Sequence, residues 1–192
     1  MRFLKQIVLT MALAMGAGSF SCTREKPKDA TCDLLVRGTS IQYNGRALPL
    51  PGSLTAWEQV FGKHSRMIDT SSNVYVWDEA GVYAIAPSSD EALQSFAVVL
   101  HSNTDPFRGA PQYWPKSTFK GRLCVDGSDI TPSSRIEDVN RTKQGQPFSR
   151  GYLDRIYSYD IIQSPRSVYV RIDLTDEGTP ESFYMGFAEE TK

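Results

Sequence analysis

The chain has 192 residues, with 21 lysines and arginines against 22 acidic residues, which gives a formal net charge of −1. A nucleic-acid-binding protein would show a basic surplus, and an aromatic content of 11% is too high for a disordered chain. Two histidines and three cysteines leave little material for a zinc site or a histidine-based catalytic triad. The composition therefore predicts a small folded protein that is not an enzyme, holds no cofactor or metal, and binds no nucleic acid.

The first residues have the pattern of an export signal. Arg2 and Lys5 give the start a positive charge, and an uncharged, mostly apolar run follows over residues 7–20. This run is shorter than the roughly 20 residues that cross a bilayer, and its length and flanks are typical of a secretory signal. We expect residues 1–21 to be a signal peptide, whose removal takes away two positive charges and leaves a net charge of −3.

The end of this run, Ser19-Phe20-Ser21-Cys22, resembles the lipobox of bacterial lipoproteins. A small residue precedes the cysteine as in that motif, whereas Ser19 and Phe20 depart from it. The resemblance implies that Cys22 is lipidated, that residues 22–31 form a flexible tether, and that the protein is held at the periplasmic face of the outer membrane. The alternative is ordinary signal-peptide cleavage, which would give a soluble periplasmic protein.

Two cysteines remain after lipidation of Cys22. An even pair in an exported protein is a candidate disulfide, so we expect Cys32 and Cys124 to be bonded. The bond would close a loop of about 90 residues and contribute about 3–4 kcal/mol in the chain-entropy model. Two buried free thiols are the alternative, and the spacing of cysteines and histidines supports no metal site.

The region 32–101 reads as one structural unit. Asn44-Gly45 between alternating residues predicts a hairpin, and Thr55 followed by Glu58 predicts a capped helix that ends at Gly62. Trp57, three or four positions from Val60 and Phe61, places an apolar stripe on this helix. Strands are expected over residues 66–69, 74–78, 82–86 and 94–101.

The region 121–192 repeats that order. Asp126-Gly127 predicts a second hairpin, and Ser134 with Glu137 predicts a second capped helix that ends near Gly145. Strands follow over residues 155–161, 167–174 and 182–187. The sequence therefore predicts an α+β fold of two tandem two-layer modules, each a short helix on an antiparallel sheet.

Two resemblances support this organisation. The segments Trp57-Glu58-Gln59-Val60-Phe61-Gly62-Lys63 and Tyr75-Val76-Trp77-Asp78 resemble those of a family of uncharacterised bacterial lipoproteins, a domain of unknown function, with His64 where proline is usual. The likeness spans residues 40–187 and implies a kind of protein, not an activity. The architecture is also similar to the tandem modules of beta-lactamase-inhibitor-like proteins and to small outer-membrane assembly lipoproteins.

The connecting segment 102–120 is the candidate binding site. It carries three prolines and several aromatic residues, and long irregular loops are often functional. Tyrosine, tryptophan and arginine are enriched where proteins bind one another, so Phe107, Arg108, Tyr113 and Trp114 are the predicted partner-binding residues. The alternative is a linker whose aromatic side chains fasten the two units together.

Catalytic motifs are missing from the sequence. His64 and His101 have no accompanying nucleophile motif, and the acidic residues near Gly127 and Gly178 are too few for a calcium loop. The leading hypothesis is a periplasmic immunity or inhibitor protein that neutralises an antibacterial toxin by occlusion. An accessory role in outer-membrane assembly or envelope maintenance is the alternative, and a small-ligand carrier or enzyme is a further one.

Overall fold

The computed structural model describes residues 32–87, 92–102, 111–163 and 166–189. The predicted signal peptide, Cys22 and the tether lie outside these residues, as do Phe107 and Arg108. Among the residues that are described, no helix is long and apolar enough to cross a membrane.

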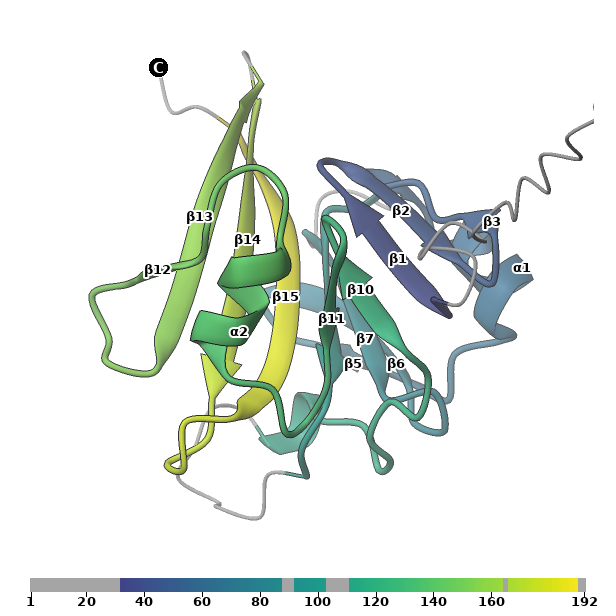
Figure 1. Ribbon diagram of the computed structural model, residues 1–192. Coiled ribbons are helices and arrows are strands. Elements are labelled where there is room, and N and C mark those ends of the chain that lie inside the picture. The colour runs from purple at the N-terminus through teal and green to yellow at the C-terminus, as the bar shows by residue number, and fades with distance from the viewer. Residues whose placement is uncertain (1–31, 88–91, 103–110, 164–165, 190–192) are drawn as a thin grey trace, which may run out of the picture.

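The described residues form mostly strands, with two short helices between them (Figure 1). Up to the connecting segment the elements are β1 (Leu34–Arg37), β2 (Ser40–Tyr43), β3 (Arg46–Ala47), β4 (Gly52–Ser53), α1 (Leu54–Phe61), β5 (Arg66–Asp69), β6 (Ser72–Trp77), β7 (Val82–Pro87), β8 (Ala92–Leu93) and β9 (Ser95–Val99). A 3-10 turn (Pro111–Tyr113) precedes β10 (Leu123–Val125), β11 (Ser128–Ile130), α2 (Ile136–Thr142), β12 (Ser149–Arg150), β13 (Ile156–Gln163), β14 (Arg166–Leu174) and β15 (Pro180–Glu189).

The largest sheet has eight strands in the order β12-β13-β14-β15-β9-β7-β6-β5. Each half of the chain contributes four strands, and the last strand of each half, β9 or β15, lies at the centre. These two strands pair antiparallel from Ser182 opposite Val99 to Gly186 opposite Ser95. The predicted order of a helix followed by antiparallel strands is thus present twice, in mirrored positions of one sheet.

A second sheet, ordered β11-β10-β1-β2-β3, also combines both halves. Its centre is a parallel ladder in which Leu34 of β1 lies opposite Leu123 of β10. The α+β class is confirmed, but the expectation that each half has a sheet of its own is wrong. The inner faces of both sheets are apolar, and sharing them buries more surface than two modules of about 70 residues could bury separately.

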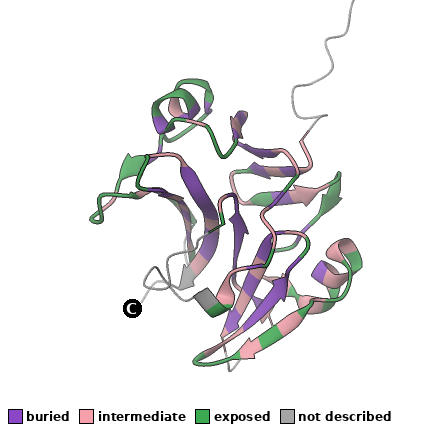
Figure 2. Cartoon of the chain, turned by 90° about the horizontal axis from the view of Figure 1, so that it is seen from below, coloured by how far each residue is buried: buried purple, intermediate pink, exposed green. Residues whose placement is uncertain are grey.

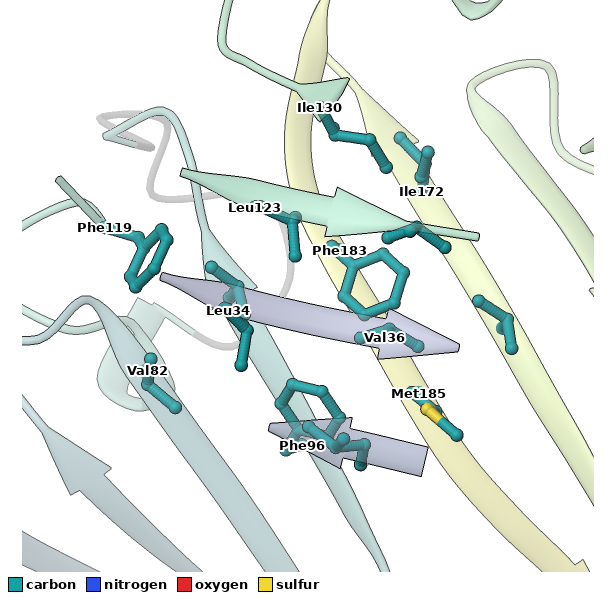
Figure 3. Packing of buried hydrophobic residues seen from close by; sticks show 14 of the residues in the cluster. Leu34, Val36, Val82, Phe96, Phe119, Leu123, Ile130, Ile172, Phe183 and Met185 are labelled. Carbon is teal, nitrogen blue, oxygen red and sulfur yellow. The ribbon is translucent and has the colours of Figure 1, made fainter. Parts of the chain in front are cut away.

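The two sheets enclose the main hydrophobic core. Leu34, Val36 and Leu123 of the smaller sheet point toward Phe96 and Phe183 of the larger one (Figure 3). The view coloured by burial shows the same arrangement, with buried strands inside and exposed turns outside (Figure 2). Alternation along β14, where every second residue is buried, is typical of a strand with one face on a core.

Helix α1 packs on the same core through Trp57, which is fully buried. Its ring centroid lies 5.3 Å from that of Phe96 and 6.1 Å from that of Trp77. The indole N–H donates to the Pro49 carbonyl at 2.9 Å, so its polar atom is satisfied. The predicted apolar stripe of this helix thus faces the core, where Trp57 meets the buried Trp77.

The starts of both helices differ from the predicted capping boxes. Ser53, not Thr55, caps α1, and its hydroxyl accepts from the Ala56 N–H. Helix α2 begins after Arg135 without a side-chain cap, because the Ser134 hydroxyl accepts from the Thr131 N–H instead. Short polar side chains compete for nearby backbone groups, which makes a cap uncertain by one or two positions from sequence alone.

Both predicted hairpin turns are present. Asn44 and Gly45, and likewise Asp126 and Gly127, have positive φ at both central positions, as the twist-matched two-residue turn requires. The predicted disulfide is also confirmed: Cys32 and Cys124 are bonded, with their Cα atoms 5.9 Å apart. The bond ties the start of β1 to β10 and so joins the two halves covalently.

Candidate functional site

A cleft of about 760 Å³ opens where the two sheets meet. Its walls are the β1–β2 turn at Arg37 and Gly38, the β10–β11 turn at Asp126, the segment 144–146 that follows α2, and residues 159–162 of β13. These four segments come from both halves of the chain. The cleft therefore exists only because the halves share their sheets.

Asp126 holds the walls of the cleft together. One carboxylate oxygen accepts from the Gly38 N–H at 2.7 Å, and the other accepts from Lys143 Nζ at 2.9 Å and from Tyr159 Oη at 2.8 Å. Its main chain joins the same set, because its N–H donates to the Val36 carbonyl and its carbonyl accepts from the Gln144 N–H. One residue thus fixes the relative positions of all four walls.

Lys143 is the most deeply buried cation of this group, with a side chain only 1% exposed. Besides Asp126, its ammonium donates to the Gln144 carbonyl at 3.0 Å and to the Gln146 carbonyl at 2.7 Å. The ammonium also lies 4.0 Å from the ring centroid of Tyr159. All three ammonium protons have acceptors and the charge faces an aromatic ring, which is the arrangement that makes a buried lysine tolerable.

These bonds set the protonation of the cluster. Burial by itself raises the pKa of the Asp126 carboxyl, but the bonds from Lys143, Gly38 and Tyr159 outweigh it and hold that pKa below its usual value. Burial and the neighbouring carboxylate raise the pKa of Tyr159. At neutral pH Asp126 is therefore a carboxylate and Tyr159 a neutral phenol, and the carboxylate accepts from both Tyr159 and Lys143.

The cleft has a mixed lining, with Arg37, Asp126 and Asp160 beside glutamine, glycine and isoleucine residues. Its described lining contains no serine, cysteine or histidine, and the charges of Asp126 and Lys143 are engaged with each other. At its rim stand Gln144, Gln146 and Ile162, all exposed. The wall segments are held rigidly, which is the condition for binding without a large loss of conformational entropy.

The described part of the connecting segment crosses the edge of the large sheet at β5 and β6. Arg66 donates to the carbonyls of Gln112 and Trp114 and, through its guanidinium, contacts both oxygens of the buried Asp78 carboxylate at 3.3 Å. Asp78 also accepts from the Lys116 N–H at 3.0 Å. The Arg66–Asp78 pair thus fastens residues 112–116 to the sheet.

The predicted binding residues Tyr113 and Trp114 lie in this fastened segment and are half-buried. The Tyr113 hydroxyl contacts the Thr70 hydroxyl at 3.2 Å. Farther along, Phe119 is buried and its N–H donates to the Val99 carbonyl. These contacts fasten the segment to the first half of the chain. Binding of a partner by its aromatic residues, and the alternative that they link the two halves, both stay predictions.

Replacing Arg66 by methionine is expected to lower the free energy of unfolding by about 1–3 kcal/mol, because the buried Asp78 carboxylate loses its cation. Residues 112–116 should also become more susceptible to limited proteolysis. The matched control is Lys116→Met, since that side chain is 77% exposed and only its backbone N–H makes the close contact with Asp78. Equal effects of the two variants in denaturant unfolding would contradict the assignment.

The other candidate groups of the sequence have structural partners. His64 Nδ1 lies 2.7 Å from Glu58 Oε1, and His101 Nδ1 lies 3.0 Å from the Pro180 carbonyl oxygen. Among the described residues, Cys32, Cys124 and Asp129 form a cluster compact enough for a metal ion. The disulfide uses both sulfur atoms of that cluster, so it offers no thiolate ligand.

The residues that build the cleft were not predicted as a site. Asp126 belongs to the predicted turn with Gly127, Tyr159 lies within a predicted strand, and Lys143 lies near the predicted end of the second helix. Each of these local interpretations is correct. No spacing in the sequence indicates that they meet, because their meeting depends on pairing between distant strands.

The comparisons with known proteins give the family but no activity. The chain belongs to the family described as Domain of unknown function (DUF7738), whose profile matches residues 33–140. The match runs from β1 into α2 and so includes the parallel ladder, Cys124 and Asp126, whereas Cys32 lies one residue before it. No curated protein and no solved structure matches the chain.

Proposed function

We propose that this chain is an exported lipoprotein, anchored through Cys22 to the periplasmic face of the outer membrane, that binds another protein without catalysis. The disulfide between Cys32 and Cys124 supports an oxidising compartment outside the cytoplasm. The apolar start and the lipobox-like Ser19–Cys22 segment support export and anchoring.

The observation that carries the binding role is the chemistry of the cleft. Asp126 and Lys143 satisfy each other and hold the walls in place, while Arg37 and Asp160 give the cleft further charge of both signs with which to contact a partner. An open cleft with fixed walls, glutamine amides and an exposed isoleucine at the rim suits a surface that receives part of another protein. A small-molecule site would need polar groups that point into the cleft without partners.

The concrete form of the proposal is an immunity or inhibitor protein. In the periplasm it would meet an incoming antibacterial toxin and block the toxin's active site by occlusion. A rigid β-sheet scaffold is favourable for this purpose, because affinity is then not reduced by ordering the binding surface.

The test is a competition between a strain that lacks the gene and its otherwise identical parent. We expect the deletion strain to be killed by parental cells in contact, and a plasmid copy of the gene to restore survival. Complementation with Trp114→Ala then shows whether protection needs this predicted binding residue. Full protection by the variant would favour the cleft as the binding surface. Equal survival of both strains would overturn the immunity role, and sensitivity of the deletion strain to detergent alone would favour envelope maintenance instead.

A further inference from the structure

The outer edge of β13 is paired over only part of its length. Strand β12 covers it with two residues, Ser149 opposite Ser158 and Arg150 opposite Tyr157. On its inner side β13 pairs with β14 along its whole length, from Ile156 to Gln163. The end of β13 therefore runs past β12, as Figure 1 shows, and this end lines the cleft.

The alternation of an antiparallel strand shows which backbone groups face outward at this end. The Ile156 carbonyl accepts from the Gly151 N–H on the outer side, and Ser158 pairs with β12 on that side. Hydrogen-bonding direction alternates along a strand, so Asp160 and Ile162 also direct their N–H and C=O groups outward. Within the described part of the chain no strand pairs with them there.

The residues that precede β12 prevent this strand from extending farther along β13. In the register of β12, the residue opposite Asp160 would be Pro147, which has no N–H to donate. Phe148, the residue before β12, is bonded to α2 instead of β13. The Asn140 side chain accepts from its N–H at 2.8 Å and donates to its carbonyl at 2.9 Å. Strand β12 thus cannot continue along β13 beyond Ser149.

The open edge also lacks the usual protection against pairing. Natural edge strands carry lysine, proline or a bulge that prevents association. Here the residues are Asp160, Ile161 and Ile162, the register with β14 is regular, and the Ile162 side chain is 78% exposed. The edge therefore has regular geometry, one exposed isoleucine and a single charge, Asp160, which a partner strand with a cation opposite it would neutralise.

We propose that the edge of β13 over residues 160–163 binds an extended segment of a partner protein, which adds to the large sheet as a further strand in line with β12. The proposal rests on the protein-binding function and specifies its mode. Asp160 and Ile162 lie on one face of β13, so the added strand should carry a cation opposite Asp160 and an apolar side chain two residues away, opposite Ile162.

The test uses random peptides displayed on phage and selected against the full chain in detergent. We expect enrichment of extended sequences with lysine or arginine two positions from an aliphatic or aromatic residue. Binding of a selected peptide should slow amide hydrogen exchange at Asp160 and Ile162 of β13. The amide of Ile161 is already bonded to β14, so its exchange should change little. Protection of Asp160 and Ile162 before any peptide is added would overturn the proposal.

Two variants separate backbone pairing from side-chain contact. Ile162→Pro removes an outward N–H without breaking the ladder to β14, and we expect it to abolish peptide binding, whereas Ile162→Thr should weaken binding by about tenfold or less. Asp160→Lys should reverse the preference toward acidic peptides. Edge pairing would be overturned if peptides bind Ile162→Pro as well as the unmodified chain, or if selection against the chain enriches no peptide. Neither result would decide whether the chain binds a protein through another surface, which the competition experiment tests separately.

Discussion

Replacing Lys143 by methionine is expected to lower the free energy of unfolding by about 3–5 kcal/mol, because it removes the cation beside the Asp126 carboxylate and the ammonium donor of the Gln144 and Gln146 carbonyls. Methionine keeps most of the side-chain volume, so the effect reports the lost bonds more than a cavity. The loss should appear as a lower midpoint in urea unfolding with an unchanged slope.

The matched control is Arg141→Met, which lies in the last turn of α2, two positions before Lys143. Arg141 pairs with Asp138 at 2.9 Å, but its side chain is 74% exposed, and such surface pairs contribute about 0–1 kcal/mol. Adding Asp126→Asn to Lys143→Met removes the unpaired charge and should recover part of the loss. Equal effects of Lys143→Met and Arg141→Met would show that the buried cluster does not hold the cleft together.

The pH dependence of the cluster follows from the lowered pKa of Asp126. The carboxyl is bonded in the folded protein and free in the unfolded chain, so the unfolded chain binds its proton at a higher pH. The contribution of Asp126 to stability is therefore complete above the ordinary carboxyl pKa and is lost as the pH falls through the lower folded value. Burial raises the pKa of Asp173 and Glu181. Protonation of these two groups in acid therefore stabilises the folded protein, whereas protonation of Asp126 destabilises it.

This opposition determines how the measurement should be made. The acid stability of the whole protein sums groups of both signs, whereas the difference between the unmodified chain and Asp126→Asn isolates one group. We expect that difference to be constant at neutral pH and to shrink as the pH falls below the ordinary carboxyl range. A difference that grows in acid would contradict the charged state assigned to Asp126.

Much of the secondary structure could be predicted because its signals are local. The Asn44-Gly45 and Asp126-Gly127 turns need positive φ at both positions, and these residue pairs supply it at low energy. The long strand β14 alternates in burial because one of its faces lies on the core. Gly62, with φ of +82°, ends α1 at the predicted residue.

The arrangement of the halves could not be predicted, because it depends on pairing between strands far apart in the chain. β1 has only four residues and pairs in parallel with β10, so no turn or residue spacing in the sequence predicts this contact. The cleft inherits this difficulty. Lys143 and Tyr159 come from the second half and Gly38 from the first, and they meet only once the shared sheets have formed.

The disulfide is expected to make the other large contribution to stability. Replacing both Cys32 and Cys124 by serine should lower the free energy of unfolding by about 4 kcal/mol, since the bond closes a loop with a sequence separation of 92 residues. The physical cause is the larger conformational freedom of the unfolded chain once the link is gone. Urea unfolding of the double variant measures the loss.

Reduction provides the internal control for this prediction. The unmodified chain in reductant should unfold like the double variant, and the double variant should not respond to reductant at all. Because the bond ties the start of β1 to β10, its loss should also raise amide exchange in the parallel ladder at Leu35 before it does so in β14 and β15. If the loss is spread evenly over both sheets, the disulfide acts only through the unfolded chain. If exchange rises first at β1, the bond also holds the native junction between the halves, and with it the Arg37–Gly38 wall of the cleft.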